Sequence, residues 1–135
     1  MLTTTRLATA LLVALVSAGG LAACSGGSDA VTDVSASEAV EVLAQPGITV
    51  IDVRTPAEYS SGHLPGAINL DVDGGSFDAQ IAELPKDDTY FVYCQSGNRS
   101  GVATDQLSSL GFTTVYDLQG GIADWQASGG TVVTS

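Results

Sequence analysis

The chain has 135 residues, of which 44% are hydrophobic and 14% are charged, so it carries enough apolar material for one compact domain and too little for two. Four lysine and arginine residues stand against fifteen acidic ones, which gives a formal charge of −11. Because nucleic-acid binding depends on clustered basic side chains, this balance excludes a nucleic-acid partner.

Residues 1–23 have the order of a secretory signal, with one charge at Arg6, an apolar run from Leu7 to Val16 and small residues before Cys24. A spanning helix needs about twenty apolar residues, and this run is only half as long. Leu21-Ala22-Ala23-Cys24 resembles the lipobox of bacterial lipoproteins. The resemblance implies that Cys24 becomes a lipidated N-terminus, which anchors the protein outside the cytoplasm on a bacterial cell membrane. The alternatives are an ordinary cleaved signal and an uncleaved anchor.

Residues 24–33 include a small, polar stretch, Ser25-Gly26-Gly27-Ser28, and are expected to form the lipidated end and a flexible spacer. The folded domain is expected to occupy residues 34–135.

Helical and strand patterns alternate in the first half of this domain. A helix is predicted over residues 35–45, with a capping box of Ser35 and Glu38 and a face made of Ala36, Ala39, Val40 and Leu43. A β-branched run predicts a strand over 48–53. Thr55, Pro56 and Glu58 begin a second helix, and a second strand is predicted over 67–70.

The alternation continues in the second half. A helix is predicted from Phe77 to Pro85, a strand over 89–93, a helix after Ser100 with a face of Ala103, Leu107 and Leu110, a strand over 113–118, and a helix over 122–127 that carries Trp125 as a core aromatic residue. Such alternation predicts an α/β fold, with a central parallel sheet and helices on both faces.

Cys94 closes a predicted strand, and the polar loop after it leads into a helix. Ligands of open α/β sheets bind at the carboxyl ends of the strands. Backbone N–H groups of the loop and the helix dipole favour an anion there, so both are expected to lower the pKa of the Cys94 thiol and to hold a persulfide formed on it. If Cys24 is acylated, Cys94 has no partner for a disulfide within the chain.

Three ordered motifs make the sequence resemble the single-domain rhodanese family of sulfurtransferases from about Ser35 to Val133. They are Ile51-Asp52-Val53-Arg54 with Glu58-Tyr59 and Gly62-His63-Leu64-Pro65-Gly66-Ala67, then Cys94-Gln95-Ser96-Gly97-Asn98-Arg99-Ser100, and finally Leu118-Gln119-Gly120-Gly121 with Trp125 and Gly129.

The resemblance implies a rhodanese-like α/β fold, with a central parallel sheet of about five short strands and helices on both faces. It also implies a reaction in which Cys94 takes sulfane sulfur from thiosulfate or a persulfide and passes it to a thiol or cyanide. It implies no metal or organic cofactor. Cys94 and Arg99 are the expected catalytic residues, and the expected substrate-binding residues are Gln95, Ser96, Gly97, Asn98 and Ser100. The six-residue loop suits one sulfur atom, whereas related dual-specificity phosphatases and arsenate reductases carry one residue more for a tetrahedral oxyanion.

Four further polar residues are expected to support the site or the scaffold. Asp52 is expected to form hydrogen bonds near the loop, and Arg54 and Glu58 are close enough in sequence to pair. His63 lies in a turn, where it is expected to be packed or hydrogen-bonded, and no metal site can be assembled around it.

Two other functions remain open from the sequence. One is a recognition or sulfide-sensing module that uses the fold without turnover, which the neutral loop and the acidic surface favour. The other is a thiol redox partner that forms mixed disulfides through Cys94. Members of the family that this sequence resembles often carry further cations near the loop when they use thiosulfate well, whereas Gln95, Ser96 and Asn98 are neutral here. With the acidic surface as well, thiosulfate is expected to be a poor donor, and a thiol persulfide or polysulfide is its competitor.

Overall fold

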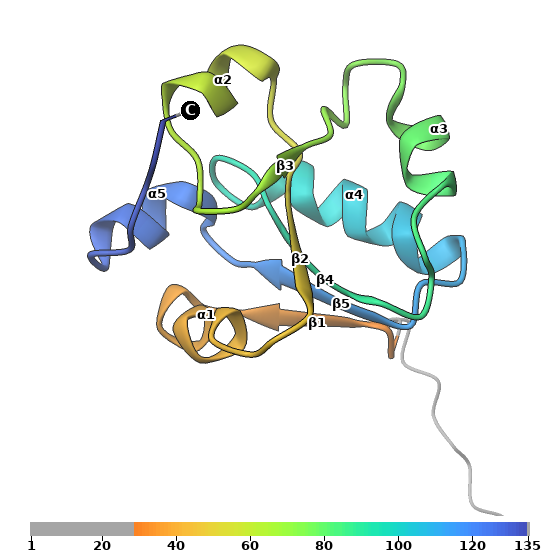
Figure 1. Ribbon diagram of the computed structural model, residues 1–135, viewed down its shortest axis with the longest axis horizontal. Coiled ribbons are helices and arrows are strands. Elements are labelled where there is room, and N and C mark those ends of the chain that lie inside the picture. Colours follow the sequence, from red (N-terminus) through yellow and green to blue (C-terminus); the bar gives the residue numbers. More distant parts are fainter. Residues whose placement is uncertain (1–28, 135) are drawn as a thin grey trace, which may run out of the picture.

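One parallel five-stranded sheet organises the computed structural model, which describes residues 29–134. The strand order is β1-β5-β4-β2-β3, with every neighbouring pair parallel (Figure 1). The strands are β1 (Val31–Val34), β2 (Ile48–Asp52), β3 (Ile68–Asn69), β4 (Thr89–Tyr93) and β5 (Thr114–Leu118). The helices are α1 (Ala36–Leu43), α2 (Pro56–Ser61), α3 (Phe77–Ala82), α4 (Asn98–Ser109) and α5 (Gly121–Ala127).

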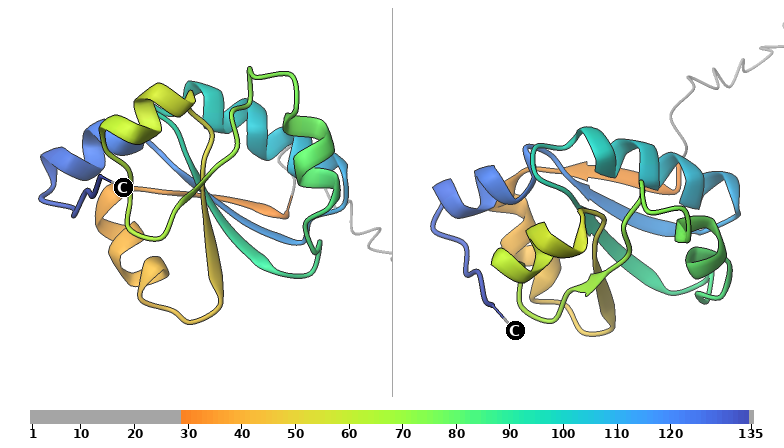
Figure 2. Two further views of the ribbon diagram at one scale, coloured as in Figure 1. Left: turned by 45° about the horizontal axis from the view of Figure 1, so that its top comes forward. Right: turned by 90° about the horizontal axis from the view of Figure 1, so that it is seen from above.

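Helices cover both faces of the sheet, as the alternating pattern predicted (Figure 2). Successive residues of β4 point to opposite faces, so Phe91 and Tyr93 pack with α1 and α5, whereas Tyr90 and Val92 pack with α3 and α4. Each face therefore has its own buried hydrophobic cluster, and Cys94 belongs to the cluster on the α4 face. The predicted α/β class, with a parallel sheet and helices on both faces, is confirmed.

Both predicted capping boxes form. In α1 the Ser35 hydroxyl accepts from the Glu38 N–H while the Glu38 carboxylate accepts from the Ser35 N–H. Thr55 and Glu58 make the same reciprocal pair at the start of α2, where Pro56 occupies the first turn. Besides starting the helix, the capping box of α2 fixes the direction of the Glu58 carboxylate.

The strand β1 corrects the expected start of the fold. Residues 31–33 were expected to belong to a flexible spacer, but Val31–Val34 pairs in parallel with β5. The sequence Val-Thr-Asp-Val has the alternation of an edge strand, which a four-residue segment beside small polar residues does not reveal. The expected Val40 contact is also wrong, because Val40 is exposed and Val42 is buried in its place.

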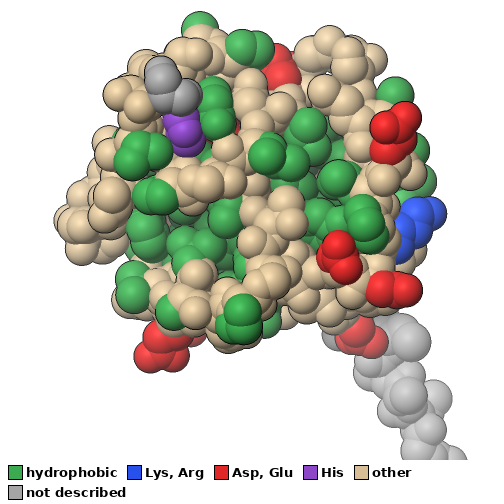
Figure 3. All heavy atoms as spheres, in the orientation of Figure 1, with side chains coloured by type: hydrophobic (Ala, Val, Ile, Leu, Met, Phe, Trp, Pro, Cys, Tyr) green, Lys and Arg blue, Asp and Glu red, His purple; other side chains and the backbone are tan. Residues whose placement is uncertain are grey.

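Hydrophobic side chains gather in the middle of the face in Figure 3, and acidic side chains lie at its margins. The strand β3 pairs with only the last two residues of β2, and the preceding residues Ile48 and Val50 line a hollow with Leu64 and Trp125. None of the helices between residues 29 and 134 has the length and hydropathy needed to cross a membrane.

Candidate functional site

The carboxyl ends of three neighbouring strands meet around Cys94. Cys94 follows β4 directly, Asp52 ends β2, and the Gly120-Gly121 pair follows β5. The loop from Cys94 to Gly97 then turns into α4, with Gly97 at the N-cap position in a left-handed conformation (φ 103°). This conformation needs glycine, and it aims the loop N–H groups back toward the sulfur.

Polar groups of the loop lie around the sulfur of Cys94. The Gly97 N–H donates to Sγ at 3.0 Å, and the thiol donates to the Ser100 hydroxyl oxygen at 3.6 Å. Burial raises the pKa of the thiol, since the residue is only 1% exposed, but donors from Ser96, Gly97 and Ser100 lower it, and the net pKa of Cys94 is below its ordinary value. The sulfur is buried, yet the polar groups around it favour the thiolate.

Replacing Ser100 by alanine is expected to raise the pKa of the Cys94 thiol. The hydroxyl is fully buried and is one of the groups that stabilise the thiolate, while the backbone N–H groups remain in the variant. Alkylation with iodoacetamide at neutral pH should slow by several-fold, and its pH midpoint should move upward. An unchanged midpoint would show that the hydroxyl does not act on the sulfur.

Helix α5 contacts the backbone of the Cys94 loop through two hydrogen bonds. Its Ile122 N–H donates to the Cys94 carbonyl at 2.9 Å, and its Ala123 N–H donates to the Gln95 carbonyl at 3.2 Å. A Cβ at Gly121 would lie 2.6 Å from both of those carbonyl oxygens. The glycine therefore permits a contact between two backbone segments that no larger residue allows.

A buried network ties the loop to β2. The Asp52 carboxylate accepts from the Arg54 guanidinium, with the shortest contact at 2.7 Å, and from the Tyr93 hydroxyl at 2.7 Å. Arg54 also donates to the Gln95 side-chain oxygen at 3.2 Å and to the Gly62 carbonyl. Asp52 is completely buried and does not approach the sulfur through any of these contacts, so the structure places it in support of the loop.

The predicted pairing of Arg54 with Glu58 is wrong. Arg54 pairs with Asp52, and Glu58 receives two hydrogen bonds from Arg99, each 2.8 Å long. The reason is geometric, because the capping box turns the Glu58 carboxylate toward the first turn of α4. The Arg99 guanidinium holds the pKa of Glu58 at about 2, so this carboxylate is ionised at neutral pH.

The remaining predicted residues differ in their exposure and in their position relative to Cys94. Gln95, Ser96 and Asn98 are exposed on the loop and at the start of α4. His63 is buried, with its ring stacked on Tyr59 at 3.7 Å and its Nδ1 2.8 Å from the Tyr59 carbonyl oxygen. Cys24 and the predicted signal lie outside the described residues.

Three supporting residues were given no role from the sequence. Tyr93 and Gly121 hold Asp52 and the loop, as described above. Asp117 on β5 is a buried carboxyl beside the hydroxyls of Ser100 and Thr104, and burial raises its pKa. Gly121 was visible in the third motif and Tyr93 in the strand before Cys94, but only the fold brings them to the loop.

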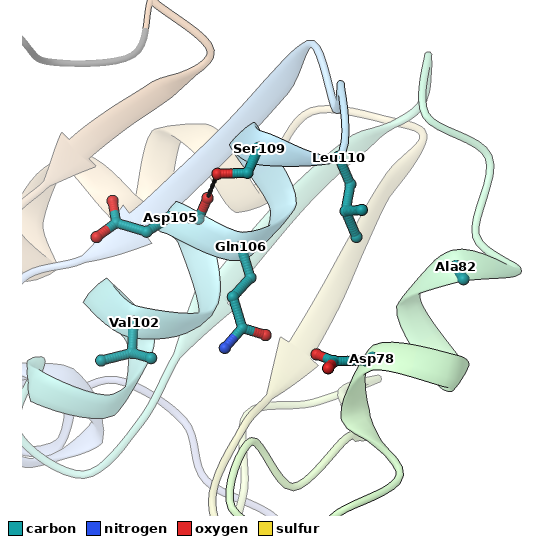
Figure 4. A pocket seen from close by; sticks show the side chains of 7 residues that line it. All are labelled: Asp78, Ala82, Val102, Asp105, Gln106, Ser109 and Leu110. Carbon is teal, nitrogen blue, oxygen red and sulfur yellow. Dashed lines mark hydrogen bonds between the residues drawn. The ribbon is translucent and has the colours of Figure 1, made fainter.

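A separate hollow lies between α3 and α4 (Figure 4). Val102, Ala82 and Leu110 give it an apolar lining, while Asp78 and Asp105 stand at its sides. Its lining includes none of the predicted site residues. Among residues 29–134, no three histidine, cysteine or acidic side chains are grouped so that they could hold a metal ion.

Comparison with known proteins places this geometry in a family. The model of the rhodanese-like domain matches residues 35–128. A sulfurtransferase of Allochromatium vinosum is 36% identical over 86 residues, which cover 64% of this chain and 78% of that protein. A thiosulfate:glutathione sulfurtransferase of Saccharomyces cerevisiae is 35% identical over 97 residues, covering 63% of this chain and 69% of its own.

Solved structures agree with this match. The crystal structure of a rhodanese-related protein from Thermoplasma volcanium is 33% identical, has a TM-score of 0.68, and covers 76% of this chain and 98% of that one. The family model spans well over half of the chain and includes the Cys94 loop, the Asp52 network and the α5 glycines. The chain belongs to the rhodanese-like domain family.

Proposed function

We propose that this protein is a sulfurtransferase that carries sulfane sulfur on Cys94. The observation that carries the proposal is the hydrogen bond from the Gly97 N–H to the Cys94 sulfur, which together with Ser96 and Ser100 favours a thiolate despite its burial. A persulfide anion has the same charge and needs the same donors, so the loop suits both states of the reaction. The homologues named sulfurtransferase support this general chemistry.

The reaction has two transfers on one nucleophile. In the first, the Cys94 thiolate attacks the sulfane sulfur of the donor, a new S–S bond forms, and the donor's own sulfur bond breaks with its electrons leaving on the donor remnant. In the second, an acceptor thiolate or cyanide attacks the outer sulfur of the persulfide, and the Cys94 thiolate leaves. No net oxidation occurs, because the sulfane sulfur changes carrier without a change in the total electron count.

We also propose that the domain works outside the cytoplasm, held to the membrane by lipid on Cys24. The support comes from the sequence order of residues 1–24. The described domain would then be displayed beyond a short tether that ends before β1.

The function is tested by incubating the purified chain with glutathione persulfide or thiosulfate and weighing it intact. We expect an added mass of about 32 Da, one sulfur atom, located on the peptide that contains Cys94. Addition of a thiol or cyanide should remove this mass and release a persulfide or thiocyanate. Absence of the adduct with both donors, at a donor excess, would contradict the proposal and favour a module that binds without turnover.

A further inference from the structure

We infer that Glu58 is a specificity-determining residue, which neutralises Arg99 and so favours a thiol persulfide over thiosulfate as the sulfur donor. The inference rests on the proposed sulfur transfer and names the donor class for the same site. The inference follows from the position of Glu58, in the cap of α2, next to Arg99 in the first turn of α4. The proposed selection acts on the charge of the donor and not on its shape.

Glu58 is held in place from two sides. One of its oxygens, Oε2, accepts from the Thr55 N–H and hydroxyl, each at 3.0 Å, as part of the capping box. The two oxygens together accept the paired 2.8 Å hydrogen bonds of Arg99. Glu58 and Arg99 are 33% and 28% exposed at their side chains, so the pair borders solvent at the site. A carboxylate with this many donors stays ionised and stays on the guanidinium.

The other described basic residues cannot replace Arg99. Arg54 is buried and paired with Asp52. Lys86 lies near the amino ends of β4 and β5, away from the carboxyl ends that meet at Cys94, and its carbonyl accepts from the Thr113 N–H just before β5. Asp73 acts on Arg99 as a further negative charge. An anion that reaches Cys94 therefore meets cations whose charges are already balanced.

The two donor classes differ in the charge that the transition state must hold. Attack of the Cys94 thiolate on thiosulfate brings together three negative charges, forms a cysteine persulfide anion and expels sulfite, a dianion. Attack on the protonated sulfane group of a thiol persulfide brings only one negative charge to the reacting sulfurs and expels a thiolate. The leaving thiolate takes up the proton that the donor brought, and Cys94 again holds a persulfide anion. The transition state of the thiosulfate reaction needs an unpaired cation near the leaving sulfite. The Arg99 guanidinium cannot serve in this way while Glu58 neutralises it.

The test compares kcat/KM for thiosulfate and for glutathione persulfide in the full chain and in Glu58→Gln. Glutamine preserves the capping box, since glutamine serves there as well as glutamate. The substitution removes the negative charge that balances the Arg99 guanidinium. The guanidinium also interacts electrostatically with the Cys94 thiolate. We expect kcat/KM for thiosulfate to rise by about tenfold or more and kcat/KM for the persulfide to change by less than about threefold. The double variant Glu58→Gln, Arg99→Ala should lose the gain.

Glu38→Gln is the matched control. Glu38 occupies the same position in the capping box of α1, where its Oε2 accepts from the Ser35 N–H and hydroxyl, and these hydrogen bonds stay within the start of α1. This variant removes the same charge and should leave the donor ratio unchanged. An unchanged ratio in Glu58→Gln, or an equal rise in Glu38→Gln, would overturn the inference and leave sulfur transfer standing. A wild-type chain inactive with both donors would overturn the proposed function itself.

Discussion

Replacing Cys94 by serine is expected to abolish sulfur transfer, with a fall in kcat/KM of about a thousand-fold or more. Serine has nearly the same shape as cysteine but cannot form a persulfide, and its oxygen stays protonated at neutral pH. Transfer from glutathione persulfide to a thiol acceptor measures the loss. The far-ultraviolet circular dichroism spectrum should stay unchanged, because the loop amides still have an oxygen to donate to.

Cys24→Ser provides the control for Cys94→Ser, since these are the two cysteines of the chain. This variant should transfer sulfur at the wild-type rate. In a bacterial host it should also leave the membrane fraction, because the lipidated side chain is missing. Retained transfer in Cys94→Ser would contradict the assigned nucleophile, and retained membrane binding in Cys24→Ser would contradict the proposed anchor.

Gly121→Ala is expected to reduce both stability and activity strongly. Alanine is strained at the φ of +60° found here, and its Cβ would lie 2.6 Å from the Cys94 and Gln95 carbonyl oxygens, which are backbone atoms. Moving either segment breaks the hydrogen bonds that fix the loop. We expect the free energy of unfolding to fall by about 3 kcal/mol or more and the transfer rate of the folded fraction to fall by about a hundred-fold.

Gly47→Ala separates the clash from the strain. Gly47 has a φ of +80°, but a Cβ there meets nothing within 4 Å. Alanine at this position should cost about 1 to 2 kcal/mol in urea unfolding and leave sulfur transfer unchanged. Equal losses in the two variants would show that backbone strain alone explains the effect of Gly121→Ala and that the contact with the loop contributes nothing.

Much of the fold could be predicted because local and global signals agree along the chain. The capping boxes at Ser35 and Thr55 mark two helix starts, and the strand over Thr89–Tyr93 has the bounds that its apolar run predicted. Strand β1 could not be found in the same way. Two of its four residues are exposed and only Val34 is buried, and the strand is held by its pairing with β5, which lies about eighty residues later in the sequence.

In the site, too, the local features could be predicted from the sequence and the contacts between distant segments could not. The Cys94 loop is contiguous, so its hydrogen-bonding pattern follows from the sequence once a strand and a helix flank it. The partner of Arg99 is not contiguous with it, since Glu58 comes from another helix. The sequence indicated a cation at the loop, and the structure shows that its charge is balanced. Sequence spacing had instead favoured Arg54, which the Asp52 network holds.

The ionisation of Cys94 is the measurement that tests the account most directly. The ultraviolet absorbance of the thiolate, recorded against pH for the wild-type chain and for Cys94→Ser, isolates the titration of this one sulfur. The donors around Sγ predict a midpoint below the ordinary range of a free cysteine. A midpoint at or above that range would mean that burial outweighs the loop donors, and the sulfur-transfer mechanism would lose its nucleophile.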